Sequence, residues 1–304
     1  MKTPKQILVV ISGRHAQHPA LERALTFSKN EDCHIHLFNV MYEPGIEITD
    51  FISKEHGKEM KSQYMADRNL YMDSLADELH KKGISCSVSL AWHRELHQAI
   101  EEKVDELDPD LVIKRISAEA TNLNPFAMPT DRHLLRYCKA PLLLIKHGCW
   151  AKKPILAAID PTAMDAKHTQ LNHHILEYSK YLAKFTGAQL HSVNTYEIPG
   201  MVPTMGLSWE NINFENIKTD TSNAHKDKME SILKEHDLFT RPYHVIEGRA
   251  DTAIPKLANK IDAQLLVLGT VGRTGVSAAF IGNTAEHVLA NMNCDILTLK
   301  PSTA

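Results

Sequence analysis

Short apolar runs alternate with amphipathic stretches along the chain. In the second half, the apolar runs have the length of β-strands. They lie at Ile155–Ile159, Leu190–Thr195, Tyr243–Ile246, Leu265–Leu268 and Ile296–Leu299. Between them, apolar residues recur at helical spacing, as in Leu171, Ile175, Tyr178, Leu182 and Phe185, and again in Ile254, Leu257, Ala258 and Ile261. Strands that alternate with helices predict a parallel sheet with helices on both faces, because each parallel connection must cross over.

The same pattern occurs twice in the chain. Ile7–Ile11 reappears as Ile155–Ile159, and the stretch from Ala99 to Lys146 reappears without a gap 154 positions later. Matched pairs in that stretch include Ala99/Ala253, Ile100/Ile254, Asp108/Asp262, Phe126/Phe280, His133/His287 and Lys146/Lys300. A constant offset over this length indicates a duplicated domain. We therefore predict two tandem, doubly wound α/β domains, residues 1–148 and 152–304, each with a five-stranded parallel sheet.

Composition narrows the class of protein. The 304 residues include 43% hydrophobic and 23% charged positions, which is typical of globular domains with real cores. The 34 basic and 37 acidic residues are interspersed, so no basic patch favours nucleic acid or an anionic membrane. Five single cysteines without a Cys-x-x-Cys motif are typical of a reducing compartment. The apolar run near the N-terminus is too short for a signal peptide, so we expect a cytoplasmic protein.

A glycine-rich segment follows the fourth strand of the second half. Gly269, Gly272 and Gly282 precede Asn283 and Thr284, and a helical stretch comes next. Doubly wound sheets bind ligands beyond the carboxyl ends of their strands, and glycines there let backbone N–H groups approach phosphate oxygens. The segment lacks the Gly-Lys-Ser/Thr of a Walker A loop. It is a candidate phosphate-binding loop, or alternatively a simple turn in which Asn283 caps the helix.

The spacing Gly269-x2-Gly272-x9-Gly282 at the end of a fourth strand resembles the nucleotide-binding loop of the universal stress protein family. The resemblance extends over essentially the whole chain as two tandem copies. It implies a stress-response protein that binds an adenine nucleotide, ATP, with Mg²⁺ as an optional companion, and in one subgroup it implies resistance to DNA-damaging agents. It also implies an intrachain pseudo-dimer, in which the two halves pack through their final strands, and leaves a further homodimer open.

The resemblance assigns roles residue by residue in the second half. Asp160 corresponds to the acidic residue on the adenosine side, and Asn194 and Thr195 fall where backbone groups meet the adenine. The ribose and phosphate positions correspond to Gly269, Gly272, Gly282, Asn283 and Thr284. Arg273 is either a cation for the phosphates or a surface residue. Asn283 departs from the Ser or Thr that the family usually has, although an amide can still donate a hydrogen bond.

The first half has lost these features. At the matching positions it carries Ser12, Arg115, Ala118, Met128 and Pro129, and proline has no N–H to offer a phosphate. We therefore expect nucleotide binding in the second half only. The first half is expected to be a degenerate, scaffold-like domain that retains room for some more apolar ligand.

Catalytic and metal-binding patterns are weak in this sequence. No nucleophile with an adjacent base can be assigned, so we predict no catalytic residue and at most a weak ATPase. His93 with His97 and His34 with His36 are expected to be solvated or hydrogen bonded rather than metal ligands. Two alternatives to a nucleotide-binding stress protein stay open. One is a slow ATP hydrolase, and the other is an interaction scaffold that binds a ligand other than a nucleotide.

Overall fold

Two units make up the chain, Lys2–Cys149 and Trp150–Ala304. The computed structural model describes residues 3–15, 17–28, 33–47, 54–116, 130–146, 150–198, 214–270, 288 and 291–301. Each unit contains one parallel sheet with alternating strands and helices, as the hydrophobic pattern predicts.

In the first half, the described strands are β1 (Gln6–Val10), β2 (His34–Met41), β3 (Ser85–Trp92), β4 (Leu111–Arg115) and β5 (Leu142–Ile145). The helices are α1 (Pro19–Phe27), α2 (Pro44–Glu47), α3 (Lys54–Lys81), α4 (Leu96–Leu107) and α5 (Thr130–Tyr137). The strands lie in the order β3-β2-β1-β4-β5, and the pairs between them are parallel. The order reverses direction at β1, so the switch point lies between β1 and β4.

The second half repeats this order. Its strands are β6 (Ile155–Ala158), β7 (Leu190–Tyr196), β8 (Tyr243–Glu247), β9 (Leu265–Gly269) and β10 (Asp295–Leu299). Its helices are α6 (Ala166–Thr186), α7 (Phe214–Glu235) and α8 (Ala250–Lys260). The strands lie in the order β8-β7-β6-β9-β10, so the switch point lies between β6 and β9. The five predicted strands are confirmed, with ends that shift by at most one residue.

The central strands are buried on both faces. Ile155, Leu156 and Ala157 of β6 and Leu265, Leu266 and Val267 of β9 are almost completely inaccessible to solvent. This is why these strands read as continuous apolar runs instead of alternating patterns. Against them packs α6, whose buried positions include Leu171, Ile175, Tyr178 and Leu182 of the predicted apolar face.

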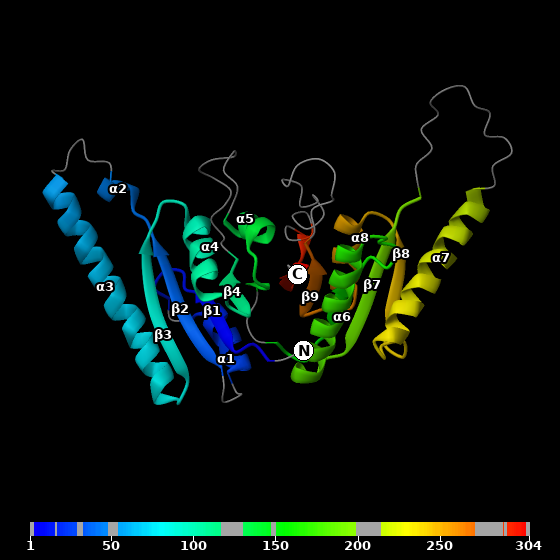
Figure 1. Ribbon diagram of the computed structural model, residues 1–304, viewed down its shortest axis with the longest axis horizontal. Coiled ribbons are helices and arrows are strands. Elements are labelled where there is room, and N and C mark those ends of the chain that lie inside the picture. The colour runs from blue at the N-terminus through cyan, green and yellow to red at the C-terminus, as the bar shows by residue number, and fades with distance from the viewer. Residues whose placement is uncertain are drawn as a thin grey trace, which may run out of the picture. The chain divides into compact units, whose positions relative to one another are not determined.

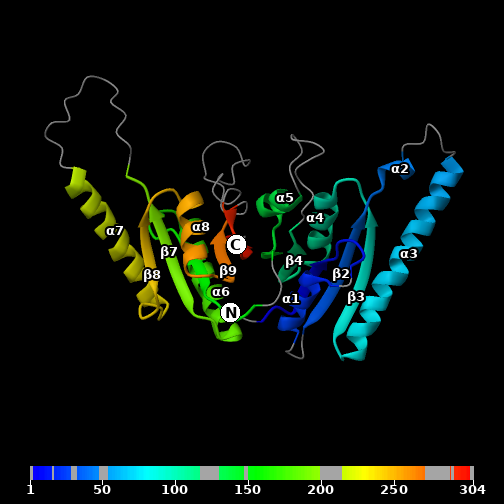
Figure 2. The same ribbon diagram turned by 180° about the vertical axis from the view of Figure 1, so that it is seen from behind.

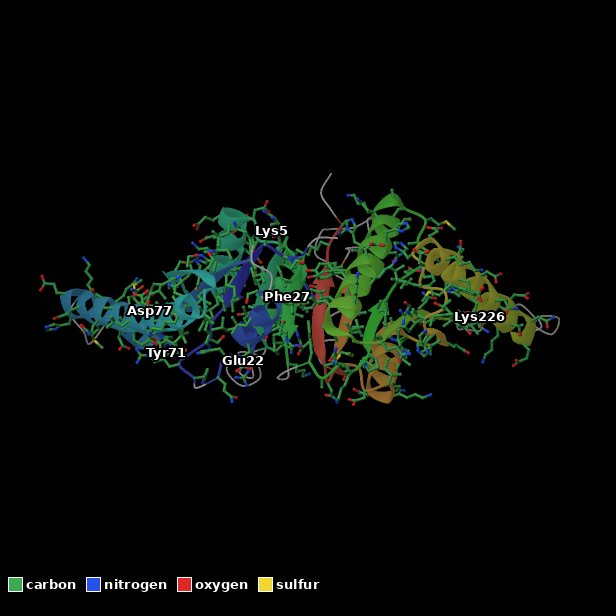
Figure 3. The ribbon with its side chains drawn as sticks, turned by 90° about the horizontal axis from the view of Figure 1, so that it is seen from below. Lys5, Glu22, Phe27, Tyr71, Asp77 and Lys226 are labelled. Carbon is green, nitrogen blue, oxygen red and sulfur yellow. The ribbon has the colours of Figure 1, made fainter. Side chains whose placement is uncertain are left out.

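Long helices cover the outer strands of both sheets. In the first half α3 runs beside β3, and in the second half α7 runs beside β8, while α8 packs against β7 (Figures 1 and 2). Many residues of these two long helices face solvent, among them Asp77 on α3 and Lys226 on α7 (Figure 3). None of the helices in the described ranges is both long and apolar enough to cross a bilayer.

Candidate functional site

A cavity of about 490 Å³ opens at the carboxyl ends of β6, β7 and β9, at the switch point of the second half. Ligand pockets usually measure about 300–1,000 Å³, so a small molecule fits this volume. Aliphatic side chains from the sheet and from α6 and α8 form part of its wall, namely Ile159, Leu171, Ile175, Ile254 and Leu268. Polar groups converge on the same space from Asp160, Thr195, His225, Arg249 and Asp251.

Asp160 directly follows β6, and the start of α6 fixes its position. The side chain of Asn172 accepts from the backbone N–H of Asp160 at 3.1 Å and donates to its carbonyl oxygen at 2.6 Å. One carboxylate oxygen, Oδ1, accepts from the backbone N–H and hydroxyl of Thr162 at 3.0 and 2.6 Å. The other oxygen, Oδ2, makes no hydrogen bond with the described residues. Asp160 therefore presents a positioned acceptor to the cavity, and its role on the adenosine side stays a prediction.

Asn194 lies at the end of β7 and is almost completely buried. Its amide Nδ2 donates to the Ile159 carbonyl at 3.1 Å, and its Oδ1 pairs with His225 Nδ1 at 2.7 Å. Both ends of the side chain are thus engaged within the protein. The Asn194 side chain supports the cavity wall, which leaves backbone groups of this strand end as the surface for a ligand.

The end of β7 extends past its neighbour. The pairing of β6 with β7 ends at Ala158 and Val193, whereas β7 continues through Thr195 to Tyr196. Thr195 lines the cavity and is partly exposed. The structure therefore brings Asp160, Asn194 and Thr195 together around one space, as the sequence predicts.

Gly269 is the last residue of β9 and also lines the cavity. A Cβ atom there would collide with the side chain of Leu171 and lie 3.2 Å from Ile175 Cδ1, both on α6. The close approach of α6 to β9 thus requires glycine at this position, independently of any ligand.

The remaining predicted site residues, Gly272, Arg273, Gly282, Asn283 and Thr284, lie outside the described residues. Their roles at the phosphates, and the predicted helix cap at Asn283, stay predictions.

Two parts of the cavity wall were not predicted from the sequence. His225 on α7 lies beside Tyr196, with 5.1 Å between the ring centroids. Burial lowers the pKa of the His225 imidazole, and the nearby Asp160 carboxylate only partly offsets this effect. The only sequence signal for His225 was indirect, because a buried asparagine such as Asn194 needs partners for both ends of its amide.

The second unpredicted part is the corner between β8 and α8. Gly248 adopts a φ of 129°, and its N–H donates to the Tyr196 carbonyl at 2.8 Å. Arg249 then forms a two-point ion pair with the buried Asp251, at 2.7 and 3.2 Å. Asp251 also raises the pKa of Arg249, so a guanidinium cation lies at the edge of the cavity. A Gly-Arg-x-Asp run at a strand end was the available signal.

The switch point of the first half differs. Asn39 repeats the arrangement of Asn194, with Nδ2 donating to the Ile11 carbonyl at 2.5 Å. A cavity next to Ser12 and Arg115 measures only about 30 Å³, which leaves room for no more than a few water molecules. Behind Arg115, the buried Lys114 and Asp131 form an ion pair at 2.6 Å. Ala118, Met128 and Pro129 lie outside the described residues.

The β1–α1 loop of the first half is tied to α3. Arg14 pairs with Asp67 at 2.5 Å, and its guanidinium lies 5.4 Å from the centre of the Tyr71 ring. The Tyr71 hydroxyl bonds His18 at 2.5 Å and donates to the His15 carbonyl at 3.2 Å. Tyr71 projects from α3 (Figure 3).

Of the histidines singled out by spacing, His34, His36 and His93 form hydrogen bonds, and His97 stacks on the ring of His133. His34 and His36 on β2 bond the hydroxyls of Ser85, Ser87 and Ser89 on β3 at 2.6–2.7 Å. His93 precedes α4, so it does not share a helical face with His97. Within the described ranges, no three His, Cys, Asp or Glu residues form a group that could hold a metal ion.

Comparison with known proteins identifies relatives along the whole chain. The model of the universal stress protein family matches residues 3–146 and again 152–300. The chain is 30% identical to the universal stress protein E homolog of Haemophilus influenzae, covering 98% of both chains. It is 29% identical to universal stress protein E of Escherichia coli K12, covering 98% of this chain and 94% of the relative.

A solved structure of similar sequence supports the fold. A functionally unknown protein from Pseudomonas aeruginosa PAO1 is 29% identical and superimposes with a TM-score of 0.75, over 98% of this chain and 93% of that chain. Together, the two family matches, the repeated strand order and the full-length relatives lead to one conclusion. The chain belongs to the universal stress protein family, a family of stress-response proteins, as a member with two tandem domains.

Proposed function

We propose that the second half binds one adenine nucleotide, ATP, in the cavity at the carboxyl ends of β6, β7 and β9. The observation that supports this most is a cavity of about 490 Å³ at the switch point, with the carboxylate of Asp160 held toward it. Its lining combines aliphatic walls with a few converging polar groups, which is typical of sites for small ligands.

The strand order suggests how a nucleotide lies there. The phosphates belong at the glycine-rich segment after β9, where Gly272, Gly282 and Arg273 are the candidates. The ribose then lies over the neighbouring β6, where Asp160 accepts hydrogen bonds from its hydroxyls. The base falls over β7, beside Thr195 and Tyr196. Mg²⁺ would accompany the phosphates and supply charge neutralisation there.

The first half has a different role in this proposal. With about 30 Å³ beside Ser12 and Arg115, it has no room for a nucleotide within the described residues. An apolar ligand for this half stays a prediction. So do the cytoplasmic location, the link to DNA-damaging stress, the pseudo-dimer and a further homodimer.

Nucleotide binding acts as a signal in this proposal, and the occupied second half is the signalling state. The two alternatives are a slow ATP hydrolase and a scaffold that binds no nucleotide. Single-turnover measurements with Mg²⁺ distinguish the first, since turnover near the roughly 10 s⁻¹ of typical enzymes would contradict a binding role. Absence of any ATP binding would favour the scaffold.

Calorimetric titration of the full-length protein with ATP tests the proposal. We expect one ATP per chain, and we expect Gly272→Val and Gly282→Val to weaken binding greatly, because a β-branched side chain blocks close backbone approach. Ala118→Val, at the matching position of the first half, is the control and leaves binding unchanged. Two ATP per chain, or unchanged binding by Gly282→Val, would contradict the proposal.

A further inference from the structure

His225 is the polar side chain that α7 contributes to the cavity. Its ring is held on two sides, by the hydrogen bond from Nδ1 to Asn194 at 2.7 Å and by the neighbouring ring of Tyr196. A side chain held in this way offers a fixed group to a ligand and loses little conformational entropy on binding.

The hydrogen bonds of Asn194 determine which nitrogen of His225 carries the proton. The Ile159 carbonyl can only accept, so the amide nitrogen of Asn194 faces it. The amide oxygen of Asn194 therefore faces His225 and needs a donor, which makes Nδ1 the protonated nitrogen. In the neutral ring, Nε2 is then an acceptor, and it makes no hydrogen bond with the described residues.

The surroundings keep this ring neutral near pH 7. Burial lowers the pKa of His225, and Lys228 on the same helix adds to that effect. Asp160, at the end of β6, acts in the opposite direction without overcoming burial, and Tyr196 faces the ring from β7.

We infer that His225 determines the base specificity of this site, by accepting a hydrogen bond from the 6-amino group of an adenine. This inference rests on the proposed nucleotide site and on the placement of the base over β7. Adenine carries an N–H donor at position 6, whereas guanine and hypoxanthine carry an oxygen acceptor there. The lone pair on Nε2 attracts the first kind of base and repels the second.

Binding of ATP and inosine triphosphate to the full-length protein tests this inference, because the two differ at position 6 of the base. We expect the wild-type protein to prefer ATP by about tenfold, as a buried acceptor left facing another acceptor is unfavourable. His225→Phe keeps a ring beside Tyr196 and removes both nitrogens, so it should reduce the preference to less than about twofold. His244→Phe, on β8 and outside the cavity lining, is the matched control and keeps the preference.

The outcomes separate this inference from the proposed function. If the wild-type protein binds ATP and His225→Phe retains the full preference, the role of His225 is wrong while the nucleotide site stands. If the wild-type protein binds neither triphosphate, the proposed function fails, and the inference fails with it.

A spectroscopic measurement on the wild-type protein does not depend on how the variant folds. Long-range proton–nitrogen correlation spectra should show His225 protonated at Nδ1, and its Nε2 signal should move with ATP but much less with inosine triphosphate. Protonation at Nε2, or equal movement with both ligands, would overturn the inference.

Discussion

The two halves share a strand order and a buried asparagine at the end of the second strand, but among the described residues the cavity at the switch point measures about 490 Å³ in the second half and about 30 Å³ in the first. Asn39 and Asn194 both donate to the carbonyl that follows the first strand. In the second half, His225 also satisfies the amide oxygen, whereas Asn39 Oδ1 has no partner among the described residues. Both halves thus keep this asparagine contact, while the surroundings of its amide oxygen differ.

The fourth strand shows the second difference. Lys114 on β4 occupies the position of Leu268 on β9, and its partner Asp131 matches Ala285 in the repeat. The first half therefore has a buried ion pair where the sequence of the second half has two apolar residues, of which Leu268 lines the cavity.

Lys114→Leu should have the largest effect on stability. It gives the first half the residue of the second, but it breaks the buried ion pair between Lys114 and Asp131 by removing one partner, which costs about 3–5 kcal/mol of unfolding free energy. Urea unfolding measures this loss. The double variant Lys114→Leu with Asp131→Ala should recover most of it, because it removes both charges of the pair and introduces the residues that the repeat carries at these two positions. A double variant as unstable as the single one would contradict this explanation.

Gly269→Ala should have the next largest effect. The added Cβ collides with Leu171 on α6, and overpacking of this kind costs about 1–3 kcal/mol. Urea unfolding again measures the loss, with Arg115→Ala at the matching, exposed position of the first half as the control. The packing requirement would be refuted if both variants were as stable as the wild type.

Asp160→Asn concerns ligand binding instead of stability. The change keeps the size of the side chain but weakens its hydrogen bonds to ribose hydroxyls, so ATP affinity should fall by about 1 kcal/mol, or roughly fivefold. Calorimetric titration measures this change. Ser12→Ala, at the matching position of the first half, should have no effect, and an equal loss in both variants would place the ligand elsewhere.

The smallest expected effect is the pH dependence of a histidine pair. His191 and His244 stack with 5.4 Å between their ring centroids, and the register places His244 where Ser89 lies in the first half. Burial first, and then the charge of His244, lower the pKa of His191 from its ordinary 6.5. His244→Ser should therefore raise the pKa of His191 toward 6.5, as measured by NMR titration.

The sign of the accompanying stability change follows from proton binding. The unfolded chain takes up protons before the folded one does, so the pair destabilises the fold as the pH drops below about 6.5. The His244→Ser variant should lose less stability over that range than the wild type. An unchanged pKa for His191 would show that burial alone sets it.

The fold could be predicted from the sequence because burial on both faces produces continuous apolar strands, as in Ile155–Ala158 and Leu265–Gly269. The repeat then supplied the domain organisation. The long helix α7 escaped prediction, since much of its surface faces solvent and its apolar spacing is weak.

Prediction of the candidate site was more uneven. Asp160, Asn194 and Thr195 came from the resemblance to the family, and the structure places all three around the cavity, while their roles stay predictions. His225 and Arg249 were missed, because their positions depend on how α7 and the β8–α8 corner pack against β7. Gly269 was predicted as part of a phosphate-binding loop, because glycine lets the backbone approach a ligand closely. The sequence spacing could not show that α6 packs too closely against this position for a larger residue.

The strand order of each half also has a consequence for the time course of folding. In each half the central strand, β1 or β6, pairs with a strand that is synthesised much later, β4 or β9. Ile7 pairs with Leu111 in this way, and Ile155 pairs with Leu265. Contacts between such distant residues form slowly, so the junction of β6 with β9 should be among the last parts of the second half to assemble. The cavity lies across that junction. A ligand can therefore bind there only when the second half is fully folded. Its binding lowers the free energy of the folded state, which raises the barrier to unfolding and slows it.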